Sequence, residues 1–151
     1  MLLKPDALQR RLAGRILDRF EAKGLQIVGL KMLRLTRQAA EAHYAPHRAK
    51  PFFPGLIAYI TSAPLVAAVL EGKSAVAVVR KMMGATFGSK AEPGTIRGDW
   101  AVSDGLNLVH GSDTQESARE EIARFFAPGD LHDWRPADLD WVYDTAAGEP
   151  R

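Results

Sequence analysis

One histidine lies where the chain could place it for nucleophilic chemistry. His110 ends a short apolar stretch, and Gly111, Ser112 and Asp113 follow it before a helix is predicted to begin. A strand end that leads into a helix start places side chains beside free backbone N–H groups, which favour anions. Glu121 lies two turns into that helix, where its carboxylate could hold the imidazole in one tautomer. These residues indicate a nucleophilic histidine, with a hydrogen-bonded structural histidine as the alternative.

Two arginines and two hydroxyl groups could bind an anion at the same place. Arg80 directly follows an apolar run, and Arg97 lies within 85–105, a Gly- and Pro-rich segment expected to be a loop. A guanidinium group matches phosphate oxygens with paired hydrogen bonds, and the hydroxyls of Thr86 and Ser112 can donate to the same group. Each arginine taken singly is also explained as a solvated surface residue. With the histidine, the pattern indicates a domain that handles phosphate.

The segment 51–55 combines prolines, a glycine and two aromatic residues. The simplest interpretation of Phe52 and Phe53 is burial in the hydrophobic core. If an aromatic edge is exposed there, it offers a surface on which a nucleotide base can stack. Both interpretations remain open from the residues alone.

Other chemically suggestive features are less informative. His43, His47 and His132 lie in helical or tail segments among polar neighbours. The string 72–74 has the form of the end of a nucleotide-binding P-loop, but the glycine required five residues earlier is Ala67. The chain contains no cysteine, which excludes disulfides, thiolate nucleophiles and Cys-ligated metals and fits a reducing compartment.

The composition is typical of one soluble domain, which we expect to span residues 1–151. The chain has 151 residues, of which 46% are hydrophobic and 25% charged. Residues 1–100 carry 16 Lys and Arg against 7 Asp and Glu, whereas residues 101–151 carry 4 against 11. That asymmetry fits a nucleic-acid face, an anionic small-molecule site or an ordinary solvated surface. The apolar runs are far shorter than the roughly 20 residues of a membrane helix, so a cytoplasmic location is expected.

The hydrophobic pattern predicts the elements that position these residues. We expect Asp6 to cap the first helix, Thr36 to cap another, and Asp113 with Glu116 to form a capping box. An acidic tail is expected from about residue 127. The predicted order is a strand at 1–3, a helix ended by Gly24, a strand at 25–35, helices at 36–44 and up to about 60, a strand at 65–70, a helix at 74–83, the loop 85–105, a strand at 107–110 and a last helix.

These motifs, taken together and in order, resemble nucleoside diphosphate kinase. The resemblance extends from Lys4 to about Phe126, and its most specific part is the Asn-x-x-His-Gly-Ser-Asp string. It implies an α+β fold, a ferredoxin-like βαββαβ sandwich whose antiparallel four-stranded sheet has helices packed on it. It also implies ping-pong transfer of the γ-phosphoryl group from a nucleoside triphosphate, typically ATP, to a nucleoside diphosphate. The strings that carry the resemblance are Lys4-Pro5-Asp6-Ala7, His43-Tyr44, Pro51-Phe52-Phe53-Pro54-Gly55-Leu56, Arg80-Lys81-Met82-Met83-Gly84-Ala85-Thr86, Pro93-Gly94-Thr95-Ile96-Arg97-Gly98-Asp99 and Asn107-Leu108-Val109-His110-Gly111-Ser112-Asp113.

The resemblance also implies roles for individual residues. His110 becomes the nucleophile, Glu121 and Ser112 orient and support it, and Tyr44 lines the site. Mg²⁺ arrives on the nucleotide phosphates, and the chain forms a homo-oligomer, a dimer-based tetramer or hexamer. The implied nucleotide-binding residues are Arg80, Thr86 and Arg97 for the phosphates, Lys4 and Asn107 for the sugar hydroxyls and terminal phosphates, and Phe52 with Leu56 for the base.

Two departures from the family pattern leave other functions open. Only residues 1–3 precede the Lys-Pro-Asp motif, so the first strand is expected to be short, and Phe87-Gly88 replaces the common Asn-Pro beside Thr86. A catalytically idle relative is therefore one alternative. A nucleic-acid-binding module is the other, although no strand carries the aromatic run typical of RNA-recognition domains and nucleic acid is not the expected main partner.

Overall fold

A four-stranded antiparallel sheet lies at the centre of the computed structural model, which describes residues 1–144. The strand order is β2-β3-β1-β4, and every neighbouring pair is antiparallel, which confirms the expected ferredoxin-like arrangement. The end of the predicted acidic tail, residues 145–151, lies outside the described residues. The strands are β1 (Leu2–Leu3), β2 (Gln26–Leu33), β3 (Leu65–Glu71) and β4 (Val109–His110).

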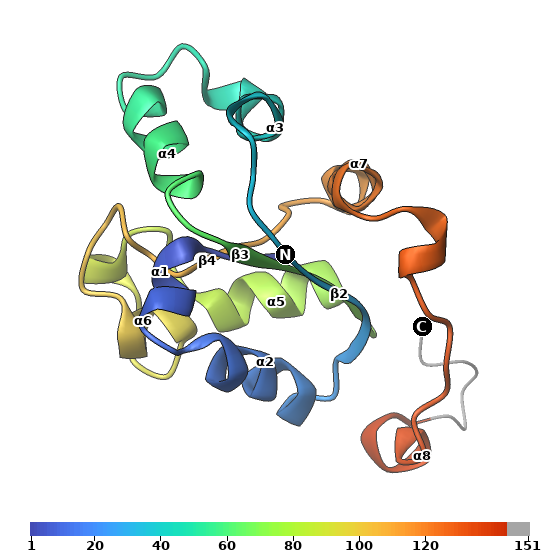
Figure 1. Ribbon diagram of the computed structural model, residues 1–151. Helices are drawn as coiled ribbons and strands as arrows, with labels where there is room; N and C mark the ends of the chain where they lie inside the picture. Colours follow the sequence, from blue (N-terminus) through green and yellow to red (C-terminus); the bar gives the residue numbers. More distant parts are fainter. Residues whose placement is uncertain (145–151) are drawn as a thin grey trace.

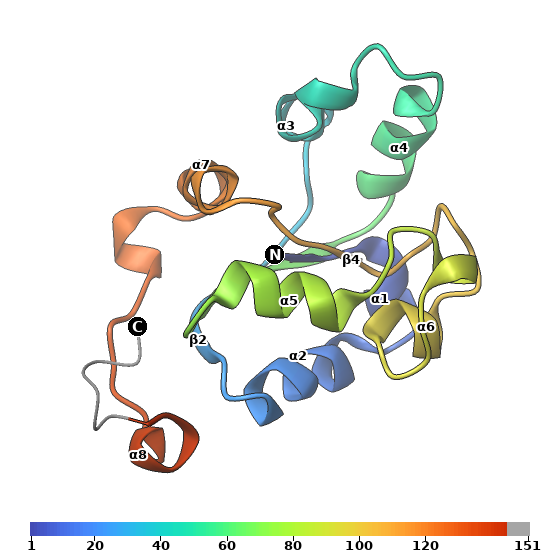
Figure 2. The same ribbon diagram turned by 180° about the vertical axis from the view of Figure 1, so that it is seen from behind.

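Helices cover both faces of this sheet, as Figures 1 and 2 show from opposite sides. α2 (Ala13–Ala22) and α5 (Ala75–Met83) pack on one face, while α3 (Arg37–His43), α4 (Phe53–Ile60) and α7 (Gln115–Phe125) pack on the other. Strands buried on both faces require apolar residues at successive positions, which β1 and β3 have. The remaining elements are α1 (Pro5–Gln9), α6 (Ile96–Trp100), α8 (Leu139–Val142) and the 3₁₀ turns η1 (Ala45–His47), η2 (Gly88–Lys90) and η3 (Pro128–Asp130).

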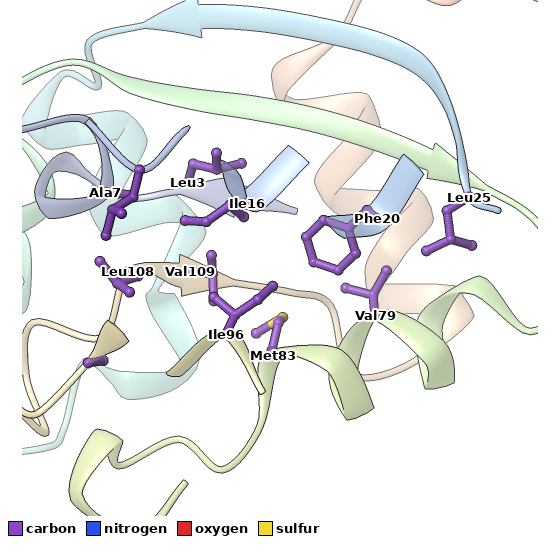
Figure 3. Close-up of a cluster of buried hydrophobic side chains, with 12 residues drawn as sticks. Leu3, Ala7, Ile16, Phe20, Leu25, Val79, Met83, Ile96, Leu108 and Val109 are labelled. Atoms are coloured by element: carbon purple, nitrogen blue, oxygen red, sulfur yellow. The ribbon is translucent and has the colours of Figure 1, made fainter. Parts of the chain in front are cut away.

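The core beneath the sheet fixes the direction in which the side chains of β4 point. Leu3, Phe20, Met83 and Val109 pack together there with other buried apolar residues (Figure 3). Successive side chains of a strand point to opposite faces. Because Val109 points into this cluster, its neighbour His110 points to the opposite face, where α3 and α7 lie.

The first helix differs from the prediction. The helical pattern is split into α1 and α2, and Arg11 between them has a φ of 57°. Pro5 occupies the first turn of α1, where its missing N–H and fixed φ suit a helix start, so Lys4 is the N-cap. Asp6 therefore lies inside the helix and does not cap it. Its carboxylate is free for longer-range contacts described below.

Two further expectations need correction. The segment 85–105 is not one loop, since it contains η2 and α6, and the Thr95 hydroxyl caps α6 by accepting from Gly98 N. The N-cap of α7 is Thr114, one residue later than expected, and Ser117 completes its capping box. Thr114 Oγ1 accepts from Ser117 N at 3.0 Å, which satisfies a free N–H of the first turn.

The predicted tail is tied to the outer side of β2. His132 N donates to Val28 O at 2.8 Å, Trp134 Nε1 to Ile27 O at 3.2 Å, and the Tyr143 hydroxyl to Gly24 O at 2.7 Å. These bonds cover part of an edge strand. No helix among residues 1–144 is long and apolar enough to cross a membrane.

Candidate functional site

His110 lies at the end of β4, and α7 returns a carboxylate to it. His110 Nε2 is 2.9 Å from Glu121 Oε2, and the Ser112 hydroxyl donates to the same oxygen at 3.1 Å. Burial alone would raise the pKa of Glu121, but the hydrogen bonds from His110 and Ser112 and the positive charge that His110 can carry lower it to about 2. An ionised carboxylate only accepts, so Nε2 carries the hydrogen and Nδ1 keeps a free lone pair. The predicted triad of His110, Ser112 and Glu121 is thus brought together.

Two rings from the end of α3 enclose His110 on the face opposite the core of Figure 3. The ring centroid of Tyr44 lies 5.9 Å from that of His110, and the ring centroid of His43 lies 4.7 Å from it, both in edge-to-face contact. Burial and the charge of Glu121 raise the pKa of Tyr44, so its hydroxyl stays protonated. The sequence pointed to Tyr44 but set His43 aside. The signal available was the spacing of Ala40, His43 and Tyr44 along one buried helix face.

A second group of polar residues lies at the start of the chain and before β4. Lys4 Nζ donates to Asn107 Oδ1, and Asn107 Nδ2 donates to Thr86 O at 2.5 Å. Lys4 and Asn107 are both buried, whereas Thr86 is exposed. Burial lowers the pKa of Lys4 to about 8, with the positive Arg97 adding to the decrease and Asp6 opposing it. Residues 103 positions apart therefore form one unit.

Arg97 is only 6% exposed and holds the backbone around the site. Its guanidinium donates to Val109 O at 2.7 Å, Gly84 O at 3.0 Å, Asn107 O at 3.2 Å and Ala85 O at 3.4 Å. Four of its five N–H groups are used in this way, which leaves one for a ligand. Burial, with a contribution from nearby Arg80, lowers the pKa of Arg97 to about 10.

The other predicted phosphate residues lie on the surface beside these buried ones. Arg80 is exposed at the end of α5 and donates to Gly111 O at 3.4 Å, directly after β4 and His110. Gly88 accounts for the departure beside Thr86, because a Cβ there would lie 2.1 Å from Ala101 O. Gly88 thus lets the chain at residue 101 close against the turn.

An exposed aromatic side chain extends the site away from His110. Phe52 is 55% exposed, so core burial is wrong for Phe52, whereas Phe53 is half-buried against the core. Ring contacts connect Phe52 to His47 at 5.8 Å, His47 to Tyr44 at 6.3 Å, and Tyr44 to His110 at 5.9 Å. Leu56, one turn after Phe52, is half-buried. This row of rings runs from the buried end of the site at His110 to the exposed Phe52.

Asp6 is a site residue whose role the sequence analysis missed. Its carboxylate accepts from Leu108 N and Ala7 N, each at 3.0 Å, and from the Tyr59 hydroxyl. Leu108 has a φ of 68°, a strained conformation for a residue with a branched side chain. Asp6 therefore holds the backbone that leads into β4 and His110.

One group of side chains in residues 1–144 could hold a metal ion. The ligand atoms of His43, His110 and Glu121 lie within 4.8 Å of one another. Mg²⁺ takes oxygen ligands and retains several waters, so a set with two imidazoles does not fit it. This group, found among residues 1–144, therefore does not fit a resident Mg²⁺ ion.

The fold and the site together define a nucleotide phosphotransferase of the α+β class. The chain belongs to the nucleoside diphosphate kinase family, because the sequence model for nucleoside diphosphate kinase matches residues 1–131. It is 54% identical over 142 residues to the nucleoside diphosphate kinase of Synechococcus elongatus, covering 94% of this chain and 95% of that one. Identity to the Archaeoglobus fulgidus nucleoside diphosphate kinase is 51% over 144 residues, covering 95% of each chain.

A solved structure gives the same result for the fold. The halophilic nucleoside diphosphate kinase of Halobacterium salinarum, determined in complex with CDP, superposes with a TM-score of 0.92. It is 48% identical, and the match covers 95% of each chain. The alternative of a nucleic-acid-binding module finds no support in these comparisons.

Proposed function

We propose that this chain transfers the γ-phosphoryl group of a nucleoside triphosphate, typically ATP, to a nucleoside diphosphate through a phosphohistidine at His110. The observation that carries the proposal is the 2.9 Å contact between His110 Nε2 and Glu121 Oε2, which leaves Nδ1 as the reactive nitrogen. In the first half-reaction the Nδ1 lone pair forms a bond to the γ-phosphorus, the bond to the bridging oxygen breaks, and the diphosphate leaves. In the second, a terminal oxygen of another diphosphate attacks and the N–P bond breaks.

The surrounding residues supply positioning and charge. Glu121 stays ionised and balances the positive charge that the ring acquires when Nδ1 is phosphorylated. Lys4, Arg80 and Arg97 neutralise charge on the transferred group and its neighbours, which is most of what phosphoryl transfer requires. Tyr44 lines the site, and the hydroxyl of Thr86 and the amide of Asn107 add hydrogen bonds to phosphate and sugar.

Mg²⁺ belongs to the substrate in this proposal. Because the described residues form no oxygen-rich cage, the ion arrives bound to the nucleotide phosphates and neutralises part of their charge. The protein then needs only the cations that face the same oxygens.

The base lies at the exposed end of the row of rings. Phe52 offers one face for stacking and Leu56 an apolar contact beside it. Stacking is tolerant of base identity because every base has a π-face. We therefore expect purine and pyrimidine nucleotides to be accepted with similar efficiency.

Labelling from γ-labelled ATP tests the proposed function. The wild-type chain is expected to form an acid-labile, alkali-stable phosphoenzyme that GDP discharges. His110→Ala is expected to take up no label, and His132→Ala, an exposed histidine on the tail, is the matched control. Labelling of His110→Ala would show that the assigned nucleophile is wrong, and turnover at background in the wild type would favour an idle relative.

A homo-oligomeric, cytoplasmic enzyme completes the proposal. β2 is an edge strand of the sheet, and its Leu30 and Met32 side chains are exposed. Such an edge is a ready pairing surface, which supports a dimer as the unit of a tetramer or hexamer. The absence of cysteine from the sequence supports a reducing compartment. Light scattering of the purified chain measures the assembly mass directly.

A further inference from the structure

His43 is a buried histidine that the proposed chemistry leaves without a task. It is the last residue of α3 and is 7% exposed. Its ring lies 4.5 Å from Tyr44, 4.7 Å from His110 and 5.2 Å from Phe125, at interplanar angles of 75°, 78° and 63°. The contacts join α3 to β4 and α7, the two elements that carry the nucleophile and its carboxylate.

The hydrogen bonding of His43 fixes its tautomer. An arginine can only donate, and Arg124 Nη1 lies 3.4 Å from His43 Nδ1, so Nδ1 accepts and Nε2 carries the hydrogen. Nε2 is buried and has no hydrogen-bond partner among the described residues. An apolar side chain would fill this space without leaving a buried N–H unpaired. What histidine adds over an apolar ring is the bond from Arg124, which holds the plane of the ring.

His43 also stays uncharged beside the nucleophile. The groups that face it are His110, Glu121, Arg124 and the amino terminus, and burial with the nearby positive groups lowers its pKa to about 3. A neutral ring does not compete with His110 for the carboxylate of Glu121. It can therefore act as a wall against His110 without disturbing the contact that fixes the reactive nitrogen.

We propose that His43, held by Arg124, is a positioning residue that keeps the His110 ring in the plane where Nε2 meets Glu121 and Nδ1 faces the phosphoryl donor. This inference rests on the proposed function, because it assigns His43 a role through the nucleophile. Rotation of the His110 ring about its Cβ–Cγ bond would break the hydrogen bond to Glu121 and turn Nδ1 away from the phosphoryl donor. Misplacement of a reacting group by about 1 Å can cost on the order of 100-fold in rate.

Rapid-quench measurement of phosphoenzyme formation from ATP tests the proposal. His43→Ala removes both the ring and its hydrogen bond to Arg124, and we expect the rate of phosphoenzyme formation at saturating ATP to fall roughly tenfold or more. The concentration of ATP that gives half the maximal rate should stay within about twofold, because the ring contacts of His43 are to Tyr44, His110 and Phe125, none of which is a proposed nucleotide-binding residue.

Two milder variants separate the effect of the His43 ring from that of its hydrogen bond to Arg124. His43→Phe keeps an aromatic ring, and Arg124→Met keeps the histidine but removes the hydrogen bond. Each should slow phosphoenzyme formation by about threefold, less than His43→Ala. The two losses should not add in the double variant, since both remove the same hydrogen bond. Arg119→Met, exposed on the same helix, is the matched control and should keep the wild-type rate.

The outcomes that would overturn the proposal are distinct from failure of the proposed function. A wild-type rate in His43→Ala, or a loss seen only in the half-saturating ATP concentration, contradicts it. ¹⁵N NMR of labelled histidine reports the His110 tautomer without turnover. The wild type should show the tautomer with the hydrogen on Nε2, and His43→Ala should show a mixture of the two tautomers. An unchanged His110 spectrum refutes positioning even if the enzyme is active, whereas absent phosphoenzyme in wild type refutes the function itself.

Discussion

The proposed site has a phosphate end and a base end, and the two are built in opposite ways. At the phosphate end, Lys4, Asn107 and Arg97 are buried and tied to one another or to backbone. At the base end, Phe52 is more than half exposed and meets the rest of the site through a single ring contact to His47. A rigid phosphate end suits chemistry that depends on position, and an open base end suits substrates that differ only in the base. For the proposed function, the difference predicts a strict reaction with loose nucleotide choice.

Removing the guanidinium of Arg97 should disrupt the rigid end most severely. Arg97→Met keeps the chain length but leaves four carbonyls without the hydrogen bonds of the guanidinium, two of them buried, so we expect a loss of about 3 kcal/mol or more in unfolding free energy. Urea denaturation measures it. The exposed Arg80→Met should cost about 0.5 kcal/mol or less while still weakening nucleotide binding. Equal stability losses in the two variants would contradict the distinction between Arg97 as a buried structural residue and Arg80 as a surface ligand of the nucleotide.

The charge of Glu121 should matter next. Glu121→Gln still accepts a hydrogen bond but no longer balances the phosphorylated ring, so kcat should fall roughly tenfold, about 1.4 kcal/mol. Steady-state kinetics with ATP and GDP measures the change. Glu120→Gln, its exposed neighbour, is the control and should leave kcat unchanged. A rise in KM with an unchanged kcat would place Glu121 in nucleotide binding instead.

The buried Lys4 should give the enzyme an alkaline limit. Its lowered pKa of about 8 means that the free enzyme loses this positive charge as pH rises through that value. Anionic phosphates bind the protonated form, so kcat/KM should fall above about pH 8 while kcat, measured with phosphate bound, falls at higher pH. The decline should level off at about tenfold and be absent in Lys4→Met. An unchanged alkaline limb in Lys4→Met would assign it to another group.

Loss of the stacking ring should have the smallest effect. Phe52→Ala is expected to raise KM about fivefold for purine and pyrimidine diphosphates alike, with kcat almost unchanged. Kinetics with several diphosphates at one ATP concentration provides the comparison. A strong dependence of the loss on base identity would show that the open end reads the base after all.

Local signals predicted the elements but not the contacts between them. The caps and ends at Thr36 and Gly84 and the strand beginning at residue 65 follow from short-range chemistry, and the structure confirms them. The roles of Asp6 and His43 depend on partners far along the chain or on another helix, and neither hydrophobic periodicity nor spacing encodes such pairings. The family resemblance supplied Lys4 and Asn107, whose pairing the residues alone could not indicate.

The surroundings of Arg97 and Phe52 could not be predicted from the sequence either. Arg97 was expected in a loop as a phosphate ligand, but most of its donors hold backbone carbonyls from α6. Phe52 and Phe53 are identical neighbours, yet one is exposed and the other half-buried, because successive residues of a helix point in different directions. Only the assembled fold decides which of the two faces the core.

The identity of the phosphorylated nitrogen tests the account most directly. Phosphoenzyme prepared from ATP can be digested under alkaline conditions, its labelled peptide located by mass spectrometry, and the phosphohistidine isomer assigned by ³¹P NMR. Because Glu121 occupies Nε2, we expect the phosphoryl group on Nδ1 of His110 and on no other residue. Phosphate on Nε2 of His110, or on His43, would contradict the arrangement from which the mechanism is derived.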